Sequence, residues 1–580
     1  MTDSPRVVWN PNFAMLKALA DAHDGRWVLD CETDGLQVRG PMAKSRVHYV
    51  GAAPLGKNFC LVWDRDHWTP AISNFLAGVR LIGHNLRFDL HALDMVPAQP
   101  WEDTMNMKYF HNTPGRKSLD DCCAAIGLPK IATPAAITAG RIAEMDPNEV
   151  AAYLADDCVK TGLVYLALIG QYSAHAPDWE WRLERAVYAM ERRGVRLLPE
   201  PFADLRGEVM RQLGEARHRL ESLGFAGEPG STQQTAEWLQ YCGYKLKRTK
   251  PTKRFPKGQL STKRDHLATL VGDEPEALID WRIQEKRRSS FVDTLPAHAI
   301  NGLIHADVRT ANTGTGRLAY ADPPLQQVPK RGEGKVFRGA FSGPSGGVAV
   351  CDYVQMEMCT AAGLSGDPVL LDIFASGNDL HEEVARLVGN LPASVDIPAD
   401  LRVQAKAINF GILNGMRPKR LAQEMTKGSG YKKRYTYAEA SRFYEGFLAR
   451  FAVLADWMDE TWRLAEKYHV AETEAGRVRP YVPNWRGEYE SSLSAVSVRV
   501  QGTAAEIVRM AVIAVEEAGL EPILQVHDEI LCDWNPTGPS KCGILGDIME
   551  EAANSAFPAL KEVKFTTDGY EGPCWAKLDE

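Results

Sequence analysis

The chain has 580 residues, of which 45% are hydrophobic and 24% charged, with a formal net charge of −8. This length accommodates three or four packed domains, and the composition excludes a disordered or fibrous chain. The negative net charge argues mildly against a protein that simply coats nucleic acid, although a local basic surface would suffice for phosphate contacts. No apolar run is long enough for a membrane helix, so no membrane partner is expected.

The 11 cysteines are scattered through the chain without a CxxC pair. Adjacent Cys122 and Cys123 do not have the spacing of zinc ligands. We therefore expect reduced, mostly buried thiols and a cytoplasmic protein.

Residues 1–175 alternate short apolar strands, at 27–30, 47–52 and 58–63, with helical segments, which predicts an α/β domain. Long helical segments follow at 184–195 and 202–225, and another at 274–295. A basic segment rich in turn residues separates the last two, so we expect an antiparallel helical arm with a basic tip. The tip is either a solvated loop or a phosphate-binding surface, and its basic residues are Lys247, Arg248, Lys250, Lys253, Arg254, Lys257 and Lys263.

The last part of the chain is also predicted to be α/β, with a helical insertion. A strand is expected at 348–352, a mainly helical stretch runs to about residue 468, and the sequence ILQVHDEILC at 523–532 predicts two short strands around a tight turn.

Three carboxylate clusters stand out near the N-terminus. Asp30 and Glu32 are two apart on a predicted strand, so both side chains emerge on one face. Asp89 follows an apolar strand, and Tyr153 and Asp157 are spaced i,i+4 on one helical face. Carboxylate oxygens suit a hard divalent cation, but each cluster alone could equally be a strand end, a helix cap or a surface helix.

Two further acidic clusters end predicted strands near the C-terminus. Asp352 ends the first strand and is followed by Gln355 and Glu357, whereas Asp528 and Glu529 lie in the predicted hairpin turn. Each could be solvent-exposed, yet buried strands that end in carboxylates also form a rigid platform for a two-metal site.

A basic helix is predicted between these clusters. Arg402, Lys406 and Phe410 are spaced i, i+4, i+8 and so form one stripe. Two cations and a ring suit a triphosphate with its sugar or base, although an amphipathic helix with snorkelling basic side chains would have the same pattern.

Taken together and in order, the three N-terminal clusters resemble the motifs of the DEDD exonucleases, in the branch that carries tyrosine. The resemblance covers roughly residues 25–170 and includes 103–105 and 118–120. It implies that Asp30, Glu32, Asp89 and Asp157 hold two magnesium ions and that Tyr153 orients the attacking water. The implied reaction is 3′→5′ removal of nucleotides from a frayed single strand.

The C-terminal clusters resemble motifs A, B and C of the family A DNA polymerases, at 352–357, 402–415 and 527–529. Linking segments match as well, and they are 313–329, 364–367, 379–381, 476–477 and 501–508. The resemblance implies an α/β multidomain fold, in which an RNase H-like exonuclease domain precedes a right-hand polymerase. The implied boundaries are exonuclease 1–175, thumb 176–300, palm 301–377, fingers 378–475 and palm 476–580.

This second resemblance also implies roles for individual residues. Asp352 and Asp528 would bind two magnesium ions, with the Tyr353 carbonyl assisting and Glu529 supporting the site; manganese is a candidate substitute. Lys406 would also protonate the pyrophosphate leaving group. Further substrate contacts are implied for Arg402, Lys406, Phe410, His381 and Gln355 near the nucleotide, Glu357 as a steric gate against ribonucleotides, and Arg317, Gln501 and His527 along the primer-template.

Four positions depart from the family pattern. Asn414 stands where the family usually has tyrosine, Ser497 and Leu493 stand where asparagine and arginine are common, and Cys359 replaces an arginine. None is an implied metal ligand. We therefore expect an active polymerase whose accuracy depends more than usual on its proofreading activity.

The two resemblances predict a template-directed DNA polymerase with its own 3′→5′ proofreading exonuclease and without 5′-nuclease activity, of the phage replicative type. Expected partners are primer-template DNA and deoxynucleoside triphosphates, with a helicase and a single-strand-binding protein as candidate accessory proteins, and the chain is expected to be a monomer. One alternative is a nuclease whose C-terminal half only binds nucleic acid. Another is a non-enzymatic single-strand-binding protein, which would need stacking aromatics along a basic groove.

Overall fold

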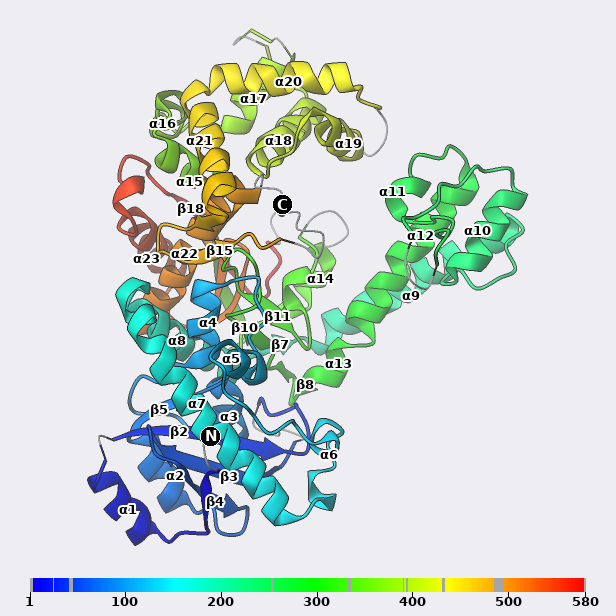
Figure 1. Ribbon diagram of the computed structural model, residues 1–580. Helices are drawn as coiled ribbons and strands as arrows, with labels where there is room; N and C mark the ends of the chain where they lie inside the picture. The colour runs from blue at the N-terminus through cyan, green and yellow to red at the C-terminus, as the bar shows by residue number, and fades with distance from the viewer. Residues whose placement is uncertain are drawn as a thin grey trace.

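The computed structural model describes residues 4–23, 25–40, 45–251, 255–330, 335–389, 391–392, 395–429, 433–483 and 494–577. Figure 1 shows an elongated body with the N-terminal sheet at one end and a group of helices at the other. A helical arm projects from the side of this body.

The N-terminal sheet has six strands in the order β1-β4-β3-β2-β5-β6. Strand β3 is antiparallel to β2 and β4, and the remaining neighbours are parallel. The strands are β1 (Arg6–Trp9), β2 (Arg26–Thr33), β3 (Val47–Pro54), β4 (Phe59–Asp64), β5 (Arg80–Gly83) and β6 (Glu102–Asp103). The three strands predicted here from sequence are confirmed as β2, β3 and β4.

Alternation along β2 separates two hydrophobic layers. Trp27, Leu29 and Cys31 pack with α1, α2 and α3, whereas Val28 packs with α4 and α7 on the other face. The helices of this part are α1 (Phe13–Asp21), α2 (Pro70–Ala77), α3 (Leu86–Ala92), α4 (Thr104–His111), α5 (Leu119–Ala125), α6 (Ala135–Thr138) and α7 (Pro147–His175), with a 3₁₀ turn at Ile142–Glu144.

Helix α8 (Trp179–Arg193) leads from this sheet to the arm, in which α9 (Pro199–Ser222) packs along α12 (Asp273–Arg287). The arm confirms the predicted helical pair, and two short helices that were not predicted from the sequence flank the basic segment of its tip. Helices α10 (Thr232–Tyr241) and α11 (Arg264–Leu267) enclose a small core that includes Phe225, Trp238 and Leu239. Lys253 and Arg254 lie outside the described residues.

The predicted helix over 274–295 is interrupted. A π-helical turn at Arg288–Val292 follows α12, and α13 (Leu295–His298) comes after it. A small sheet at the base of the arm has the order β12-β7-β9-β8. Its strands are β7 (Val195–Leu197), β8 (Ala299–Ile300), β9 (Leu303–Ile304) and β12 (Phe341–Ser342), and nearby elements are β10 (Asp307–Arg309), β11 (Ala319–Ala321), a 3₁₀ turn at Leu325–Gln327 and α14 (Lys335–Gly339).

The second large sheet has the order β16-β17-β13-β18 and is antiparallel throughout. Its strands are β13 (Gly347–Tyr353), β16 (Pro522–Val526), β17 (Glu529–Trp534) and β18 (Thr567–Gly572). Helices α22 (Ser494–Glu517) and α23 (Cys542–Asn554) pack against it, and a 3₁₀ turn lies at Pro558–Leu560. The predicted strand at 348–352 and the predicted hairpin are confirmed.

The helical insertion between β13 and α22 is confirmed and forms the end of the body opposite the first sheet (Figure 1). It comprises α15 (Met356–Ser365), α16 (Pro368–Ala375), α17 (Leu380–Gly389), α18 (Ala399–Leu413), α19 (Pro418–Gly428), α20 (Tyr437–Arg450) and α21 (Ala452–Tyr468), followed by the hairpin β14 (Val470–Glu472) and β15 (Val478–Pro480).

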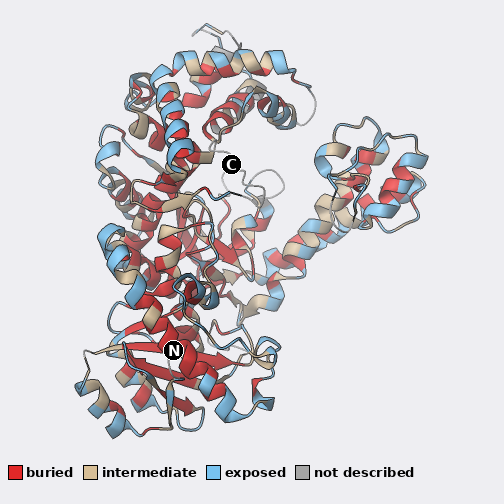
Figure 2. Cartoon of the chain, viewed as in Figure 1, coloured by how far each residue is buried: buried red, intermediate tan, exposed pale blue. Residues whose placement is uncertain are grey.

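Buried residues gather through the two large sheets and the helices that cover them, and exposed residues follow the outer faces (Figure 2). One continuous hydrophobic core joins the second sheet, the helical insertion and the base of the arm. All 11 cysteines are free thiols, nine of them buried. No helix in the described ranges is long and apolar enough to cross a membrane.

Candidate active sites

Five predicted residues of the first site come together beside β2. Asp30 and Glu32 lie on the face of the strand that α7 covers, and α7 supplies Tyr153 and Asp157. Asp89 comes from α3, and its Oδ1 accepts a hydrogen bond of 2.9 Å from the Cys31 backbone N–H. The alternation of β2 therefore directs two carboxylates toward the helix that carries the third and the tyrosine.

The electrostatics of this cluster show how close the carboxylates lie. Burial, followed by repulsion from Asp89, Glu32 and Asp157, raises the pKa of Asp30 well above its usual value. Burial likewise raises the pKa values of Glu32, Asp89 and Asp157. In the described ranges no group of three or more His, Cys, Asp or Glu side chains is arranged to hold a metal ion. The donor set nevertheless fits a hard divalent cation, because one would relieve this repulsion.

The sequence interpretation missed Lys130. Its Nζ lies 2.8 Å from Asp157 Oδ1 and 3.2 Å from Asp120 Oδ1, and 4.8 Å from the centre of the Tyr153 ring. The Tyr153 hydroxyl is 3.1 Å from that of Thr133, within hydrogen-bonding distance. Nothing in the spacing of Lys130 indicated this role, because a lone lysine in a loop is ordinarily solvated.

The second site lies at one end of the second sheet. Asp352, near the end of β13, pairs in register with Glu529 at the start of β17. The Tyr353 backbone N–H donates to the Asp528 carbonyl over 3.2 Å, which places Asp528 beside Asp352. Burial raises the pKa of Asp528 to about 6, and burial also raises that of Asp352, opposed by the Lys330 ammonium. Two predicted metal ligands are thus adjacent on a rigid pair of strands.

The Glu529 carboxylate accepts hydrogen bonds from two residues that the sequence interpretation did not single out. Arg338 Nη1 donates to both carboxylate oxygens, over 2.9 and 3.0 Å, and the indole N–H of Trp575 donates to Oε1. The Arg338 guanidinium also lies 4.0 Å from the centre of the Trp575 ring. Lys330 Nζ contacts Asp352 and lies 3.5 Å from Glu529 Oε2, so a cation lies directly beside the acidic pair.

The predicted nucleotide-binding residues lie on α17 and α18. Arg402 forms an ion pair with Asp379, and Gln355 Nε2 donates to the same carboxylate over 3.4 Å. His381 Nδ1 lies 2.9 Å from Asn409 Nδ2. Lys406 is half-buried on α18, whereas the side chain of Phe410 lies outside the described part.

The proposed steric gate belongs to a hydrogen-bonded cluster. Arg317 Nη2 lies 2.5 Å from Glu357 Oε1, and Gln501 Nε2 lies 3.4 Å from Glu357 Oε2. Gln501 Nε2 also donates to Asn414 Oδ1 over 2.7 Å, and Ser497 Oγ donates to the same oxygen over 2.9 Å. Two of the departures from the family pattern, at 414 and 497, therefore contact one another and connect to Glu357 through Gln501.

The other positions singled out from the sequence differ in their surroundings. His527 is exposed and has a left-handed backbone at φ 58° in the tight turn before Asp528. Cys359 is buried in α15 and carries no charge in place of the arginine. Leu493 lies outside the described residues.

Comparisons with known proteins agree with this geometry. The sequence profile of DNA polymerase family A matches residues 201–577. The thermostable DNA polymerase I of Thermus caldophilus is 32% identical over 404 residues, which are 67% of this chain and 47% of that protein. The DNA polymerase I of Rhizobium leguminosarum is 30% identical over 447 residues, which are 72% of this chain and 42% of that protein. The chain thus spans about half the length of these relatives.

One solved structure resembles almost the whole chain. It is the polymerase domain of Pol1 from M. smegmatis in complex with DNA primer-template and dNTP, with a TM-score of 0.79 and 24% identity. The match covers 99% of this chain and 100% of that one. At this identity the likeness shows the fold.

Proposed function

Because the chain belongs to DNA polymerase family A, we propose that it extends a DNA primer along a template by nucleotidyl transfer from deoxynucleoside triphosphates. The observation that carries this proposal is the adjacency of Asp352 and Asp528 at the end of two paired, buried strands. A pair of divalent ions held there would activate the primer 3′ oxygen and stabilise the leaving pyrophosphate. Magnesium is the expected metal.

The residues around this platform suit the same reaction. Glu529, fixed by Arg338 and Trp575, keeps the hairpin turn in place, so Asp528 cannot drift from Asp352. Arg402 and Lys406 of α18 would bind the incoming triphosphate together with His381 of α17. Lys406 also supplies the proton that the departing pyrophosphate takes up.

We propose that Glu357 excludes ribonucleotides, because its buried carboxylate is held by Arg317 and Gln501 and cannot swing away from a 2′-hydroxyl. Arg317 and Gln501 are also proposed to contact the minor groove of the primer-template. Asn414 cannot stack on a base as a tyrosine would. Its contacts with Ser497 and Gln501 make selection at this position depend on hydrogen bonding instead.

We assign the arm, over 176–300, as the thumb, the second sheet as the palm, over 301–377 and 476–580, and the helical insertion, over 378–475, as the fingers. The basic residues of the arm tip suit contacts with duplex phosphates. Primer-template DNA is the proposed partner, and replication of a phage genome in the host cytoplasm is the proposed setting.

The first 175 residues are proposed to be a 3′→5′ proofreading exonuclease. The supporting observation is the convergence of four carboxylates and Tyr153 on the α7 face of β2. Two divalent ions bound there would activate water for in-line attack on the terminal phosphodiester. Tyr153, fixed by Thr133 and Lys130, would orient that water.

Primer extension on a labelled primer-template with magnesium tests both proposals. Extension with nucleotides and 3′ degradation without them are expected. Asp528→Ala should abolish only extension, and Asp30→Ala only degradation. Extension by the Asp528→Ala variant would refute the polymerase assignment, and degradation by the Asp30→Ala variant would refute the exonuclease assignment.

A further inference from the structure

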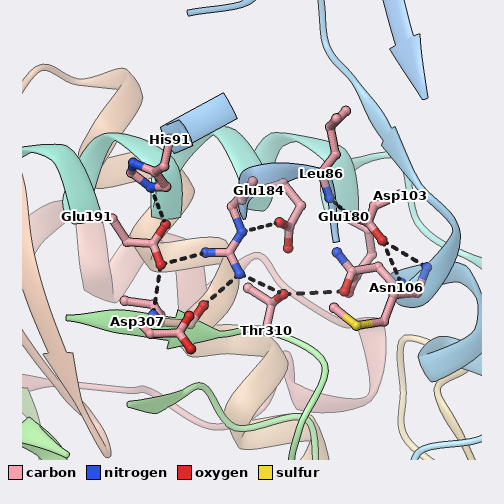
Figure 3. Close-up of polar contacts among 12 residues, drawn as sticks. Leu86, His91, Asp103, Asn106, Glu180, Glu184, Glu191, Asp307 and Thr310 are labelled. Carbon is pink, nitrogen blue, oxygen red and sulfur yellow. Dashed lines mark hydrogen bonds and ion pairs between the residues drawn. The ribbon is translucent and has the colours of Figure 1, made fainter. Parts of the chain in front are cut away.

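Arg87 lies two residues before Asp89 in α3, and its side chain is almost completely buried between the N-terminal sheet and the rest of the body. Its Nε lies 2.6 Å from Glu184 Oε2 and its Nη1 lies 3.3 Å from Glu191 Oε1, both on α8. Nη2 donates to the Val308 carbonyl of β10 over 2.6 Å. Figure 3 shows how Glu184, Glu191 and Thr310 lie relative to one another at this boundary.

Glu191 also contacts other residues between the N-terminal sheet and the rest of the body. Its carboxylate accepts from His91 Nε2 over 2.8 Å, from Arg39 Nε over 3.2 Å and from the Val308 backbone N–H over 2.8 Å. Burial alone would raise the pKa of Glu191, but the ion pairs with Arg87 and Arg39 hold it well below its usual value. The Glu191 carboxylate therefore stays charged in the interior, and its contacts connect Arg39, Arg87 and His91 of the first domain to α8 and β10.

Helix α3 is also held by Leu86 and Leu90, which are buried in the core of the first sheet, and by the hydrogen bond from the Cys31 N–H to Asp89. It is seven residues long, and its N-cap, Asn85, makes no side-chain capping hydrogen bond. Its remaining polar tie to the first sheet at the N-terminal end is a hydrogen bond of 2.8 Å from the Leu86 N–H to Asp103. Arg87 lies two residues before Asp89 and His91 two residues after it, and both side chains contact Glu191, so this network holds α3 on both sides of Asp89.

We propose that Arg87 is a positioning residue for the exonuclease reaction, which sets the Asp89 carboxylate through contacts with Glu184 and Glu191 of α8 and the Val308 carbonyl of β10. The exonuclease site would then be completed by elements outside its own sheet. This inference rests on the proposed exonuclease function. The anchoring elements, α8 and β10, connect the proposed nuclease to the proposed polymerase. A change to the contacts that Arg87 makes with them should therefore slow degradation and leave primer extension unchanged.

Arg87→Lys in the full chain is the main test, because it keeps the buried charge and cannot reach all of the acceptors. We expect the single-turnover rate of 3′ degradation on a single-stranded oligonucleotide to fall ten- to hundredfold, as when partners that orient metal ligands are altered. The KM for the oligonucleotide should stay unchanged, and primer extension should stay within about twofold of the parent. Glu191→Gln provides a second variant that keeps the shape of the acceptor.

Arg192→Lys is the matched control, because Arg192 also joins α8 to the first domain, at Asp94, but on the surface. It should leave both rates unchanged. Hydrogen exchange gives a readout independent of metal and activity: amides over 86–92 should exchange faster in Arg87→Lys and not in Arg192→Lys.

An unchanged degradation rate in Arg87→Lys, or equal losses of degradation and extension, would overturn the inference. Loss of degradation without faster exchange over 86–92 would overturn it as well. Failure of the unaltered chain to degrade the oligonucleotide would instead refute the exonuclease function itself. If Glu191→Gln does not fold, Arg87→Lys decides the question alone.

Discussion

Replacing Arg338 by methionine is predicted to lower both the stability of the polymerase part and its rate of primer extension, because Glu529 loses its buried ion pair. The side chains of Arg338 and Glu529 are 7% and 4% exposed, so their ion pair is inside the protein and needs no discount for solvent screening. Removing one partner of a buried pair costs about 3–5 kcal/mol, because the remaining charge is left without compensation. Lys330 and the Trp575 N–H still contact Glu529, so we expect the lower end, about 3 kcal/mol.

Such a loss corresponds to a fall of about 6–12 °C in the thermal midpoint of the polymerase part, at about 2–4 °C per kcal/mol. The hairpin turn carries Asp528 next to Glu529, so the primer extension rate should fall at least about tenfold. Degradation of a single-stranded oligonucleotide serves as the control and should be unchanged, because Arg338 lies outside the first sheet. Thermal unfolding and the two rates are measured on the same preparation.

The double variant Arg338→Met with Glu529→Gln decides whether the cause is the stranded charge. Neutralising Glu529 removes the uncompensated carboxylate, so the double variant should be more stable than Arg338→Met alone. The reasoning is refuted if Arg338→Met unfolds within 2 °C of the parent, or if the double variant is no more stable than the single one.

Three other predictions follow from the two sites. In EDTA, the free energy of unfolding should fall as pH rises from about 5 to 8. Burial, followed by repulsion from Asp157, raises the pKa of Glu32 to about 8, so the folded state holds a proton that the unfolded state has released. Glu32→Gln should reduce this pH dependence in thermal unfolding, and an unreduced dependence would contradict the assignment. Glu357→Ala should raise ribonucleotide incorporation at least tenfold relative to deoxynucleotides in single-nucleotide kinetics, and an unchanged ratio would exclude a gate. Asn414→Ala should raise misincorporation several-fold in an Asp30→Ala background, and equal error rates would show that Asn414 does not select bases.

Local patterns in the sequence predicted much of the fold and the acidic residues of both sites. Alternation along 27–33 was enough to put Asp30 and Glu32 on one face, and the i,i+4 spacing put Tyr153 with Asp157. The strand at 348–352 and the hairpin around Asp528 were likewise predicted from apolar runs that end in carboxylates.

Residues that act through distant partners could not be predicted in this way. Arg338 and Glu529 are 191 residues apart, and Arg87 meets Val308 across 221 residues, so no local period links them. Helices α10 and α11, on either side of the basic segment of the arm tip, were not predicted from the sequence. Trp238 and Leu239 form a core there only with residues from α9, α11 and α12.

A primer with a mismatched 3′ end tests most directly the central claim that one chain carries both activities. On such a primer-template, with magnesium and all four deoxynucleoside triphosphates, the unaltered chain should remove the mismatched nucleotide and extend to full length. The sequenced products should carry the matched base, and Asp30→Ala should retain the mismatch in every product. Full-length products that keep the mismatch from the unaltered chain, or corrected products from Asp30→Ala, would contradict the account.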